Sequence, residues 1–332
     1  MLRSGLPRGR GSVMEYLCRF EQFSDFGDFT QELQGWETTF VQLSVGQLKI
    51  DHGCFDAGDV ILHRTRFGLG SACRSTRRTD WPSLAIDLSP KRWCGIDVPV
   101  GTVRLIVPGR EMHVVSHDPW DTLFISIHRD TLARWAPGVA DALDADLTPD
   151  HYLLPSDPTA VDALIGWTQA LLSARPAIDD ADEAKEWAGA LRQRLKQHLL
   201  AVLGSEPPTR RISSLHRVAR YDAALAALEA IHRAGPRKVT VASLARELGI
   251  TNRAIEYAFR SVIGVGPSQY MLAERLNRAR HDLRGGWRSK SSVTTIAFQY
   301  EFENLSRFTS QYTRLFGERP SDTLRAAKNA LG

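Results

Sequence analysis

The chain of 332 residues is 43% hydrophobic and 24% charged, a composition that excludes a fibrous or intrinsically disordered protein and allows real hydrophobic cores. Its length suits two domains. No segment approaches the roughly 20 consecutive apolar residues that span a bilayer, and the basic opening MLRSGLPRGRGSVMEY lacks the apolar stretch of a secretion signal. We therefore expect a cytoplasmic protein with no membrane partner.

A formal net charge of +4 conceals an uneven distribution of charge. From Arg210 to the C-terminus there are 21 Lys and Arg residues against 10 Asp and Glu residues, which leaves 21 basic against 28 acidic residues in the rest of the chain. This opposition predicts a basic module that binds nucleic acid, joined to an acidic module with another task. The alternative is chance drift of surface charge.

The first 30 residues are expected to form a flexible arm, in which Met14 offers an alternative start. From about Leu43 to Ile127, short apolar or alternating runs are punctuated by Gly, Pro and Asp. This texture predicts a small antiparallel β-barrel or sandwich. The expected strands are Gly46–Ile50, Val60–Arg64, Leu84–Leu88, Val103–Val107 and Asp121–Ile127.

After Arg129 the pattern becomes helical. Ala160–Ser173 and Ala184–Leu203 carry large apolar residues at steps of three and four, which places those residues on one helix face. These faces either pack on the barrel or also form a dimer seam. Residues 204–214 are short, polar and proline-bearing, which is typical of a linker. An amphipathic helix is expected next, over Val218–Arg233.

Two short capped helices follow the linker region. Thr240 is a suitable N-cap for a helix over Val241–Leu248, and Gly249 comes next, where a tight turn requires a positive φ. Thr251 then caps a second helix that runs to about Val262. A short helix, a glycine turn and a second helix predict a helix-turn-helix, whose second helix enters the major groove of DNA. The expected shared core is Leu244, Ala245, Leu248, Ile255, Ala258 and Phe259.

The same pattern recurs further along the chain. Ser292–Ala297 aligns with Thr240–Ala245 at an offset of 52 residues, and the second helix aligns at an offset of 53, which implies one inserted residue in the second turn. The helical stretch Ser268–Leu283, opened by Pro267, joins the two units. At 1.5 Å per residue it spans about 24 Å. With the flanking elements added, two recognition helices would sit about 34 Å apart, one turn of B-DNA.

Specific motifs in this region support the same interpretation. They are Ala242–Ala245, Ile250, Arg253–Ile255, Ala258–Arg260, Gly264–Pro267, Tyr270, Arg275-Leu276, Ala279-Arg280 and Phe316–Ser321. Together they resemble the AraC/XylS family of transcription regulators over about Tyr221–Arg325. One position departs from the family, which has glycine where Glu301 precedes Phe302. A left-handed conformation at Glu301 would cost on the order of 1 kcal/mol.

The resemblance implies an α+β fold. It comprises an N-terminal cupin-like β-barrel with a helical dimerisation segment, and a C-terminal all-α domain with two helix-turn-helix motifs joined by a linker helix. Residues 31–203 would form the sensor and dimerisation domain, and residues 215–332 the DNA-binding domain. The implied function is an effector-responsive activator that binds promoter DNA as a homodimer and contacts RNA polymerase. Residues 36–48 and 93–95 more distantly resemble ethanolamine-operon regulators within the family.

Excluding core positions leaves one outer face on each expected recognition helix. In the first unit it carries Asn252, Arg253, Glu256, Tyr257 and Arg260, and in the second Ser306, Arg307, Thr309, Ser310 and Arg314. Arg253 suits guanine O6 and N7, and Glu256 suits cytosine N4. The alternative for Glu256 is a surface ion pair with Arg253 or Arg260. Arg288 and Lys290, with Arg314, are expected to contact phosphates.

The N-terminal half lacks the patterns of catalysis. Its histidines do not form the His-x-His pair of metal-bearing cupins, and no Gly-rich phosphate loop or GxSxG elbow is present. We therefore expect no metal, no cofactor and no enzyme activity, and we expect the four scattered cysteines to be buried reduced thiols. Residue type alone nominates a ligand pocket of Arg64, Trp81, Trp93, Arg104 and His113. The rival functions are a ligand-independent DNA-binding regulator and a cupin enzyme fused to a DNA-binding tail.

Overall fold

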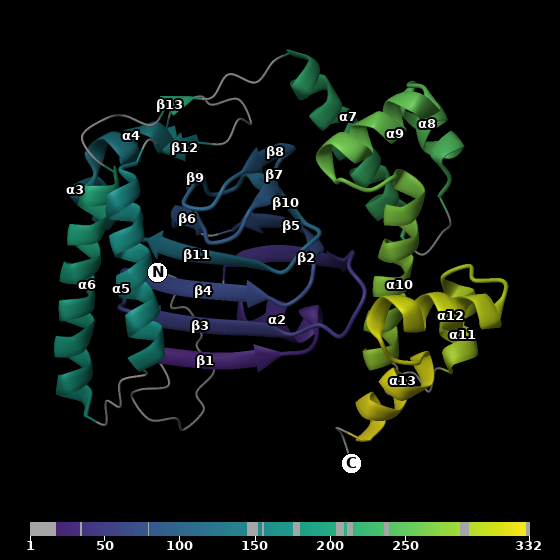
Figure 1. Ribbon diagram of the computed structural model, residues 1–332, viewed down its shortest axis with the longest axis horizontal. Helices are drawn as coiled ribbons and strands as arrows, with labels where there is room; N and C mark the ends of the chain where they lie inside the picture. The colour runs from purple at the N-terminus through teal and green to yellow at the C-terminus, as the bar shows by residue number, and fades with distance from the viewer. Residues whose placement is uncertain are drawn as a thin grey trace.

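The computed structural model describes residues 18–33, 35–78, 80–144, 152–154, 156–174, 180–203, 209–210, 215–235, 239–285 and 292–329. The fold is α+β, as predicted, with a β-rich N-terminal region and a helical C-terminal region (Figure 1). No helix in these described ranges is both long enough and apolar enough to cross a membrane.

Two antiparallel sheets form the N-terminal region. The larger sheet contains, in spatial order, β1 (Cys18–Phe23), β3 (Ile50–Asp56), β4 (Val60–Phe67), β11 (Trp120–Ile127), β6 (Ser83–Asp87), β9 (Val103–Ile106), β12 (Tyr152–Leu154) and β13 (Thr209–Arg210). The smaller sheet contains β2 (Trp36–Gln42), β5 (Ser71–Arg77), β10 (Glu111–Ser116), β7 (Lys91–Trp93) and β8 (Ile96–Val98). We refer to this pair of sheets as the sheet domain.

Alternation along the strands directs side chains into the space between the sheets. In β4, His63, Thr65 and Phe67 share one face, because successive side chains of a strand point to opposite sides. Thr38 of β2 lies opposite Ser75 of β5 in the register of the smaller sheet, and their hydroxyl oxygens are 2.6 Å apart. The interior of the sheet domain is therefore partly polar, which weakens the hydrophobic alternation that sequence reasoning relies on.

Helices cover the outer face of the larger sheet. They are α3 (Arg129–Trp135), α4 (Pro137–Asp144), α5 (Pro158–Ala174) and α6 (Ala181–Leu203), while the short α2 (Phe26–Glu32) packs beside β2. Leu164 of α5 and Leu195 of α6 are completely buried in a cluster with strand residues such as Leu123. The apolar faces of α5 and α6 thus pack on the sheet, which both alternatives for these helices require, and a dimer seam on them stays a prediction.

The C-terminal region consists of α7 (Leu215–Ala234), α8 (Val241–Leu248), α9 (Asn252–Val262), α10 (Pro267–Gly285), α11 (Val293–Gln299), α12 (Leu305–Phe316) and α13 (Pro320–Asn329). Figure 1 shows α10 as a rod between the sheets and the last helices. The first helix pair shares a hydrophobic cluster with the sheet domain, in which Trp93 and Phe259 both take part. The second pair has its own cluster, built around Phe308 and Tyr312.

The expected strand over Gly46–Ile50 is wrong, because residues 46–49 form a loop and β3 begins at Ile50. Gly46 has a φ of 135°, and its backbone groups have partners outside any strand ladder. Its N–H donates to the Leu315 carbonyl (3.0 Å), and its carbonyl accepts from the Gln42 side chain (2.8 Å). The strands that were not anticipated are β1, β2, β5, β7, β8, β10, β12 and β13.

Part of the expected flexible arm is ordered. Residues 18–23 form β1, which pairs with β3 along its whole length, and Phe20 packs edge-on against Phe55 at 5.7 Å. Residues 1–17 lie outside the described residues. So does most of the expected linker, residues 204–214, but Thr209 and Arg210 are described and pair with β12 as the edge strand β13.

Candidate nucleic-acid interface

The turn between α8 and α9 forms as the sequence predicts. The Thr240 hydroxyl accepts from the Ser243 N–H (3.0 Å), and the Ser243 hydroxyl accepts from the Thr240 N–H (3.0 Å). This reciprocal capping box satisfies two donors that a helix start leaves free. Gly249 ends α8 with a φ of 65°, and the Thr251 hydroxyl caps α9 through the Ala254 N–H (3.1 Å).

The second turn repeats the first, bond for bond. The N–H of Ile250 donates to the Ala245 carbonyl (3.0 Å), and the N–H of Phe302 donates to the Ala297 carbonyl (2.9 Å). Glu301 occupies the position of Gly249 and has a φ of 55°, so the left-handed conformation whose cost was considered for this residue is present. The inserted residue falls after Phe302, because Asn304 and not Glu303 is the N-cap of α12.

Core packing fixes which face of α9 is free. Ile255, Ala258 and Phe259 are buried to 1% exposure or less, as expected. Asn252 and Arg253 are exposed. Because the helix repeats every 3.6 residues, Arg253 lies on the side opposite the core, whereas Asn252, two turns before Phe259, is exposed at the N-terminal end of the helix. A basic and an amide side chain therefore stand free at the start of the expected recognition helix.

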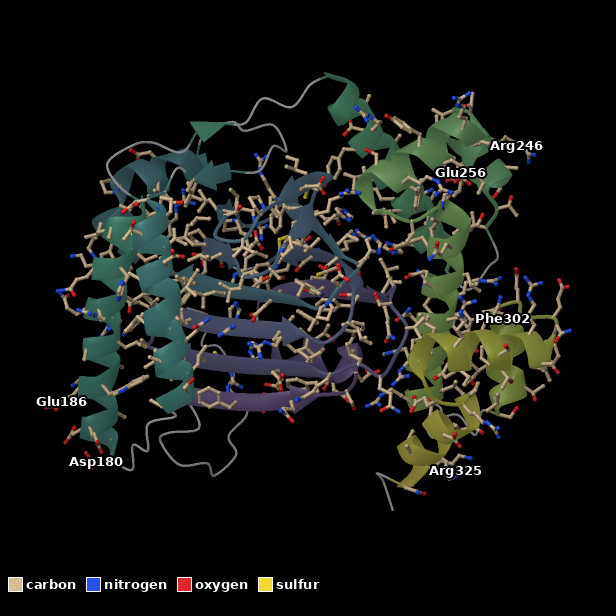
Figure 2. The ribbon with its side chains drawn as sticks, viewed as in Figure 1. Asp180, Glu186, Arg246, Glu256, Phe302 and Arg325 are labelled. Atoms are coloured by element: carbon tan, nitrogen blue, oxygen red, sulfur yellow. The ribbon has the colours of Figure 1, made fainter. Side chains whose placement is uncertain are left out.

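Three residues on this face have protein partners. Glu256 forms an ion pair with Arg260 one turn later (3.7 Å), which is the alternative noted for this glutamate. Tyr257 is 59% exposed, and its hydroxyl accepts from Arg220 Nη1 of α7 (3.1 Å). Figure 2 shows Glu256 in the helical region remote from α5 and α6. Both contacts are at the surface, where such pairs contribute little and exchange readily.

The outer face of α12 carries polar side chains, several of them short. Asn304 Oδ1 caps the helix by accepting from the Arg307 N–H (2.8 Å), and Phe308 and Tyr312 are fully buried. The expected outer residues Ser306, Arg307, Ser310 and Arg314 are exposed, and Thr309 is half-buried. Arg288 and Lys290, the expected phosphate contacts, lie outside the described residues.

The five residues nominated for a ligand pocket do not converge. Arg64 is paired with Asp121 (2.7 Å), and Trp81 packs edge-on against His128. Trp93 and Arg104 are buried together, with the guanidinium 3.5 Å from the ring centre. His113 lies 2.9 Å from Glu111, and this hydrogen bond lowers the pKa of Glu111 to about 2. Residue type did not reveal which strand face each side chain would occupy.

Sequence reasoning missed a cavity of about 50 Å³ inside the sheet domain. Aromatic rings dominate its lining, and two buried polar atoms there, Trp36 Nε1 and His63 Nε2, have no hydrogen-bond partner. Burial holds the pKa of His63 well below its usual value, so the ring is neutral. An unpaired buried polar atom is costly, which makes this cavity a candidate for an absent hydrogen-bonding guest. The sequence Trp36-Glu37-Thr38-Thr39-Phe40 carried the available signal, because alternation along a strand places Trp36, Thr38 and Phe40 on one face, and all three line the cavity.

A buried cation, Arg77, also lies in the interior of the sheet domain, against the Trp36 ring. Arg77 is 4% exposed, and its Nε donates to the Trp81 carbonyl (3.2 Å). Its guanidinium lies 4.9 Å from the Trp36 ring centre, and desolvation lowers its pKa to about 10. A second small cavity, of about 40 Å³, is lined by Arg77 and His63. Among the described residues, no group of three His, Cys, Asp or Glu side chains is arranged to hold a metal ion.

Comparison with known proteins identifies the helical region. Residues 244–326 match the family model of a helix-turn-helix domain. The probable thc operon regulatory protein of Rhodococcus erythropolis is 33% identical over 87 residues, 26% of this chain and 26% of that protein. The XylDLEGF operon transcriptional activator of Pseudomonas putida is 27% identical over 160 residues, 46% of this chain and 47% of that protein.

A solved structure matches about a third of this chain. A probable AraC family transcriptional regulator from Rhodopseudomonas palustris is 33% identical, and the match covers 32% of this chain and 97% of that chain with a TM-score of 0.30. The chain spans from about a quarter to about half of the length of these curated relatives. Through its duplicated helix-turn-helix region, the chain is similar to transcription regulators of the AraC/XylS family.

Proposed function

We propose that this protein is a sequence-specific DNA-binding transcription regulator, and that its two recognition helices enter successive major grooves of promoter DNA. The observation that carries the proposal is the repeated capped turn, which presents α9 and α12 with their buried faces inward and their polar faces free. The basic C-terminal region supports it, because Lys and Arg neutralise phosphates. Residues 215–332 would be the DNA-binding domain.

We assign the choice of base mainly to the first unit. Arg253 is exposed at the second position of α9, where its fork can donate to guanine O6 and N7. Glu256 can accept from cytosine N4 once Arg260 turns from it to a phosphate. The hydroxyls of Ser306, Thr309 and Ser310 discriminate bases weakly, so the second unit would contribute mostly affinity.

The test begins with selection of randomised duplexes by the full chain. On the selected duplex, Arg253→Ala should cost about 1–3 kcal/mol and relax base choice at one position. Lys290→Ala, at the proposed phosphate contact, should instead weaken binding to all sequences alike and reduce its salt dependence. Failure of the wild-type chain to select any duplex would refute the function. Equal losses for Arg253→Ala on selected and random DNA would refute only the assigned role of Arg253.

We infer that the sheet domain senses a small effector, and that the protein is an activator that works as a homodimer and contacts RNA polymerase. Support for an effector comes from the interior cavity and its unpartnered Trp36 Nε1 and His63 Nε2. A guest there would be small and largely apolar, with one group that hydrogen-bonds to these atoms. Its binding would raise the melting temperature of the protein by mass action.

Thermal-shift screening with small aromatic acids and amines tests this part. A shift that His63→Leu abolishes would support the cavity as the site, because leucine keeps the volume and removes the polar atom. A panel without any shift would favour the alternative, a regulator that binds DNA independently of a ligand. Analytical ultracentrifugation with and without the hit measures the expected dimer.

A further inference from the structure

The C-terminal end of α9 is capped from the sheet domain. The last carbonyls of a helix have no partners within it. Here Arg92 Nη1 of β7 donates to the Arg260 carbonyl (3.3 Å), and His117 Nε2, just after β10, lies 3.1 Å from the Ile263 carbonyl. Gly264 follows with a φ of 80°. A Cβ at this glycine would come within 2.3 Å of His117 Nε2, so only glycine lets the imidazole approach the helix end.

The C-terminal end of α12 is capped by the same domain. The Leu315 carbonyl accepts from the Gly46 N–H (3.0 Å) and from Gln42 Nε2 (2.9 Å). Gln42 is 2% exposed, and its Nε2 also lies within 2.9 Å of the Ser44 carbonyl. The side chain is therefore held in one orientation by the loop that follows β2, and that orientation directs it at α12.

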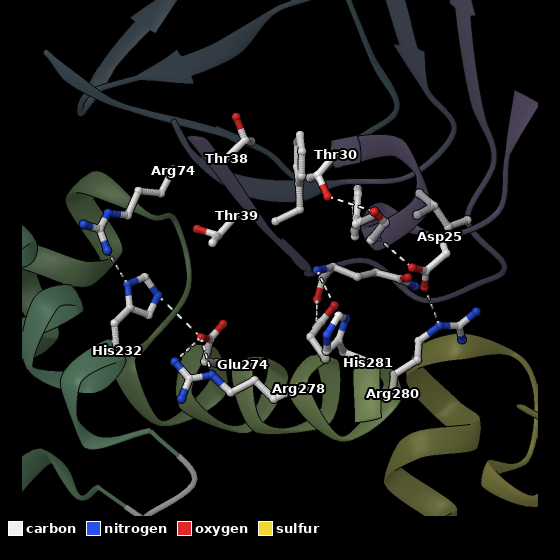
Figure 3. Close-up of a pocket in the computed structure, with 16 residues that line it drawn as sticks. Asp25, Thr30, Thr38, Thr39, Arg74, His232, Glu274, Arg278, Arg280 and His281 are labelled. Atoms are coloured by element: carbon white, nitrogen blue, oxygen red, sulfur yellow. Dashed lines mark hydrogen bonds and ion pairs between the residues drawn. The ribbon is translucent and has the colours of Figure 1, made fainter. Parts of the chain in front are cut away.

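The connecting helix α10 is tied to the same strand end. Asn277 Oδ1 accepts from the Gln42 N–H (3.0 Å), and Asn277 Nδ2 donates to the Gln42 carbonyl (3.3 Å). A cleft of about 390 Å³, which Gln42 and Asn277 also line, separates the rest of α10 from β2 and α2. Figure 3 shows polar bridges at its two ends, where His232 accepts from Arg74 (3.0 Å) and Arg280 pairs with Asp25 (3.6 Å).

Among the described residues, the two helix-turn-helix units do not share a hydrophobic core. Ile255 and Phe259 of the first unit belong to the cluster that extends into the sheet domain, whereas Phe308 and Tyr312 of the second unit belong to a separate cluster. The position of α12 relative to α9 thus depends on α10 and on the sheet domain, which packs against the first unit and caps both units. Long helices are rarely straight, so α10 alone does not define the distance between its two ends, and the caps from the sheet domain add that constraint.

We propose that the sheet domain sets the spacing between the two recognition helices, and that Gln42 and His117 are positioning residues for DNA recognition. The proposal rests on the proposed function, since spacing matters to binding only if both helices read one duplex. Half-sites on DNA have to match the protein in distance and in rotation about the helix axis. A chain that has lost its caps should therefore tolerate spacings that the intact chain rejects.

The first test compares the selected duplex with duplexes in which one base pair is inserted or removed between the two half-sites. The double variant Gln42→Ala/His117→Ala should bind the selected duplex about tenfold more weakly, and its preference over the altered spacings should shrink at least threefold. Gln22→Ala/His128→Ala, which removes the same residue types from the same domain away from α10, should keep the wild-type preference. If the Gln42/His117 variant keeps the wild-type preference for the selected spacing, the proposal is overturned. A loss of folded protein cannot imitate the expected result, because it weakens binding to all duplexes equally and leaves that preference unchanged.

The second test needs no DNA. Spin labels at Arg246→Cys on α8 and Thr294→Cys on α11 report the distance between the units, since both positions are exposed and the four native cysteines are buried. Pulsed electron paramagnetic resonance should give a narrow distance distribution for the otherwise wild-type chain and a broadened one when Gln42 and His117 are alanine. His117→Ala alone should broaden it partly, which guards against misfolding of the double variant. Identical distributions would overturn the proposal even if the protein binds DNA as proposed.

Discussion

Replacement of Glu301 by glycine should stabilise the second helix-turn-helix unit. Glu301 has a φ of 55°, and a left-handed conformation costs a residue with a Cβ about 1–2 kcal/mol. Glycine removes that cost but adds about 0.4–1 kcal/mol of chain entropy in the unfolded state. The variant also loses the attraction between Glu301 and Arg275, worth a few tenths of a kcal/mol for a pair near the surface. The net gain is about 0.5 kcal/mol.

Comparison with alanine isolates the backbone contribution. Glu301→Ala loses the same carboxylate and keeps the left-handed conformation, so it should be less stable than Glu301→Gly by about 0.8 kcal/mol. Amide hydrogen exchange of the full chain, followed by mass spectrometry over residues 293–316, reports local opening of this unit. Exchange should be about twofold slower than wild type in the glycine variant, since 1.4 kcal/mol corresponds to roughly tenfold.

Glu303→Gly serves as the matched control, because Glu303 is exposed, lies in the same turn and does not have a positive φ. It should speed exchange, since it adds chain entropy without relieving strain. If the alanine and glycine variants at position 301 exchange at the same rate, the conformation of Glu301 stores no strain and the reasoning fails.

Two further perturbations test the sheet domain. Asp87 is fully buried and accepts from Arg104 Nε (2.7 Å) and from Lys91 Nζ (3.0 Å), so Asp87→Asn should cost about 3–5 kcal/mol in urea unfolding. Glu37→Gln, which breaks an exposed pair with Arg78, should cost less than about 1 kcal/mol; similar losses would contradict the burial argument. Desolvation lowers the pKa of His52 and of His232 to about 4, so the unfolded chain binds more protons between pH 4 and 6.5. Stability should be full above pH 6.5 and fall as the pH drops toward 4, by up to about 1.4 kcal/mol per unit for each ring. Urea titrations across this range should show a shallower fall for His232→Gln, and an unchanged slope would exclude His232 as a contributor.

The limits of α8 and α9 were predictable to the residue because the signals that set them are local. Thr240, Gly249 and Thr251 act within one turn of the chain through caps and a left-handed residue, and the repeat of the pattern removed the ambiguity of a single match. The left-handed Glu301 followed from the same alignment. The ion pair between Glu256 and Arg260 was foreseen as an alternative, since both residues lie one turn apart on one helix.

The sheet domain was harder to predict because strand pairing is not local. β2 and β5 carry Thr38, Ser75 and Arg77 toward the interior, where hydroxyls pair across strands and a cation lies against Trp36. These inward polar residues erase the alternation that identifies a strand. The residues nominated for a ligand pocket do not line one common pocket for the same reason, since the sequence does not show which face of a strand each occupies. Arg64 and His63 are neighbours on β4, and only the register decides which of them faces the cavity.

The short strand β13 limits how far the two parts of the molecule can separate. Arg210 is held against Tyr152 and α7 begins at Leu215, so about five peptide units, or at most about 18 Å of extended chain, form the tether. Even with every polar bridge broken, the helical region would remain at an effective concentration on the order of millimolar beside the sheets. Any conformational switch in this protein should therefore be a rotation of the helical region about a short tether, and it should be rapidly reversible. The individual polar bridges between the helical region and the sheets can then be weak.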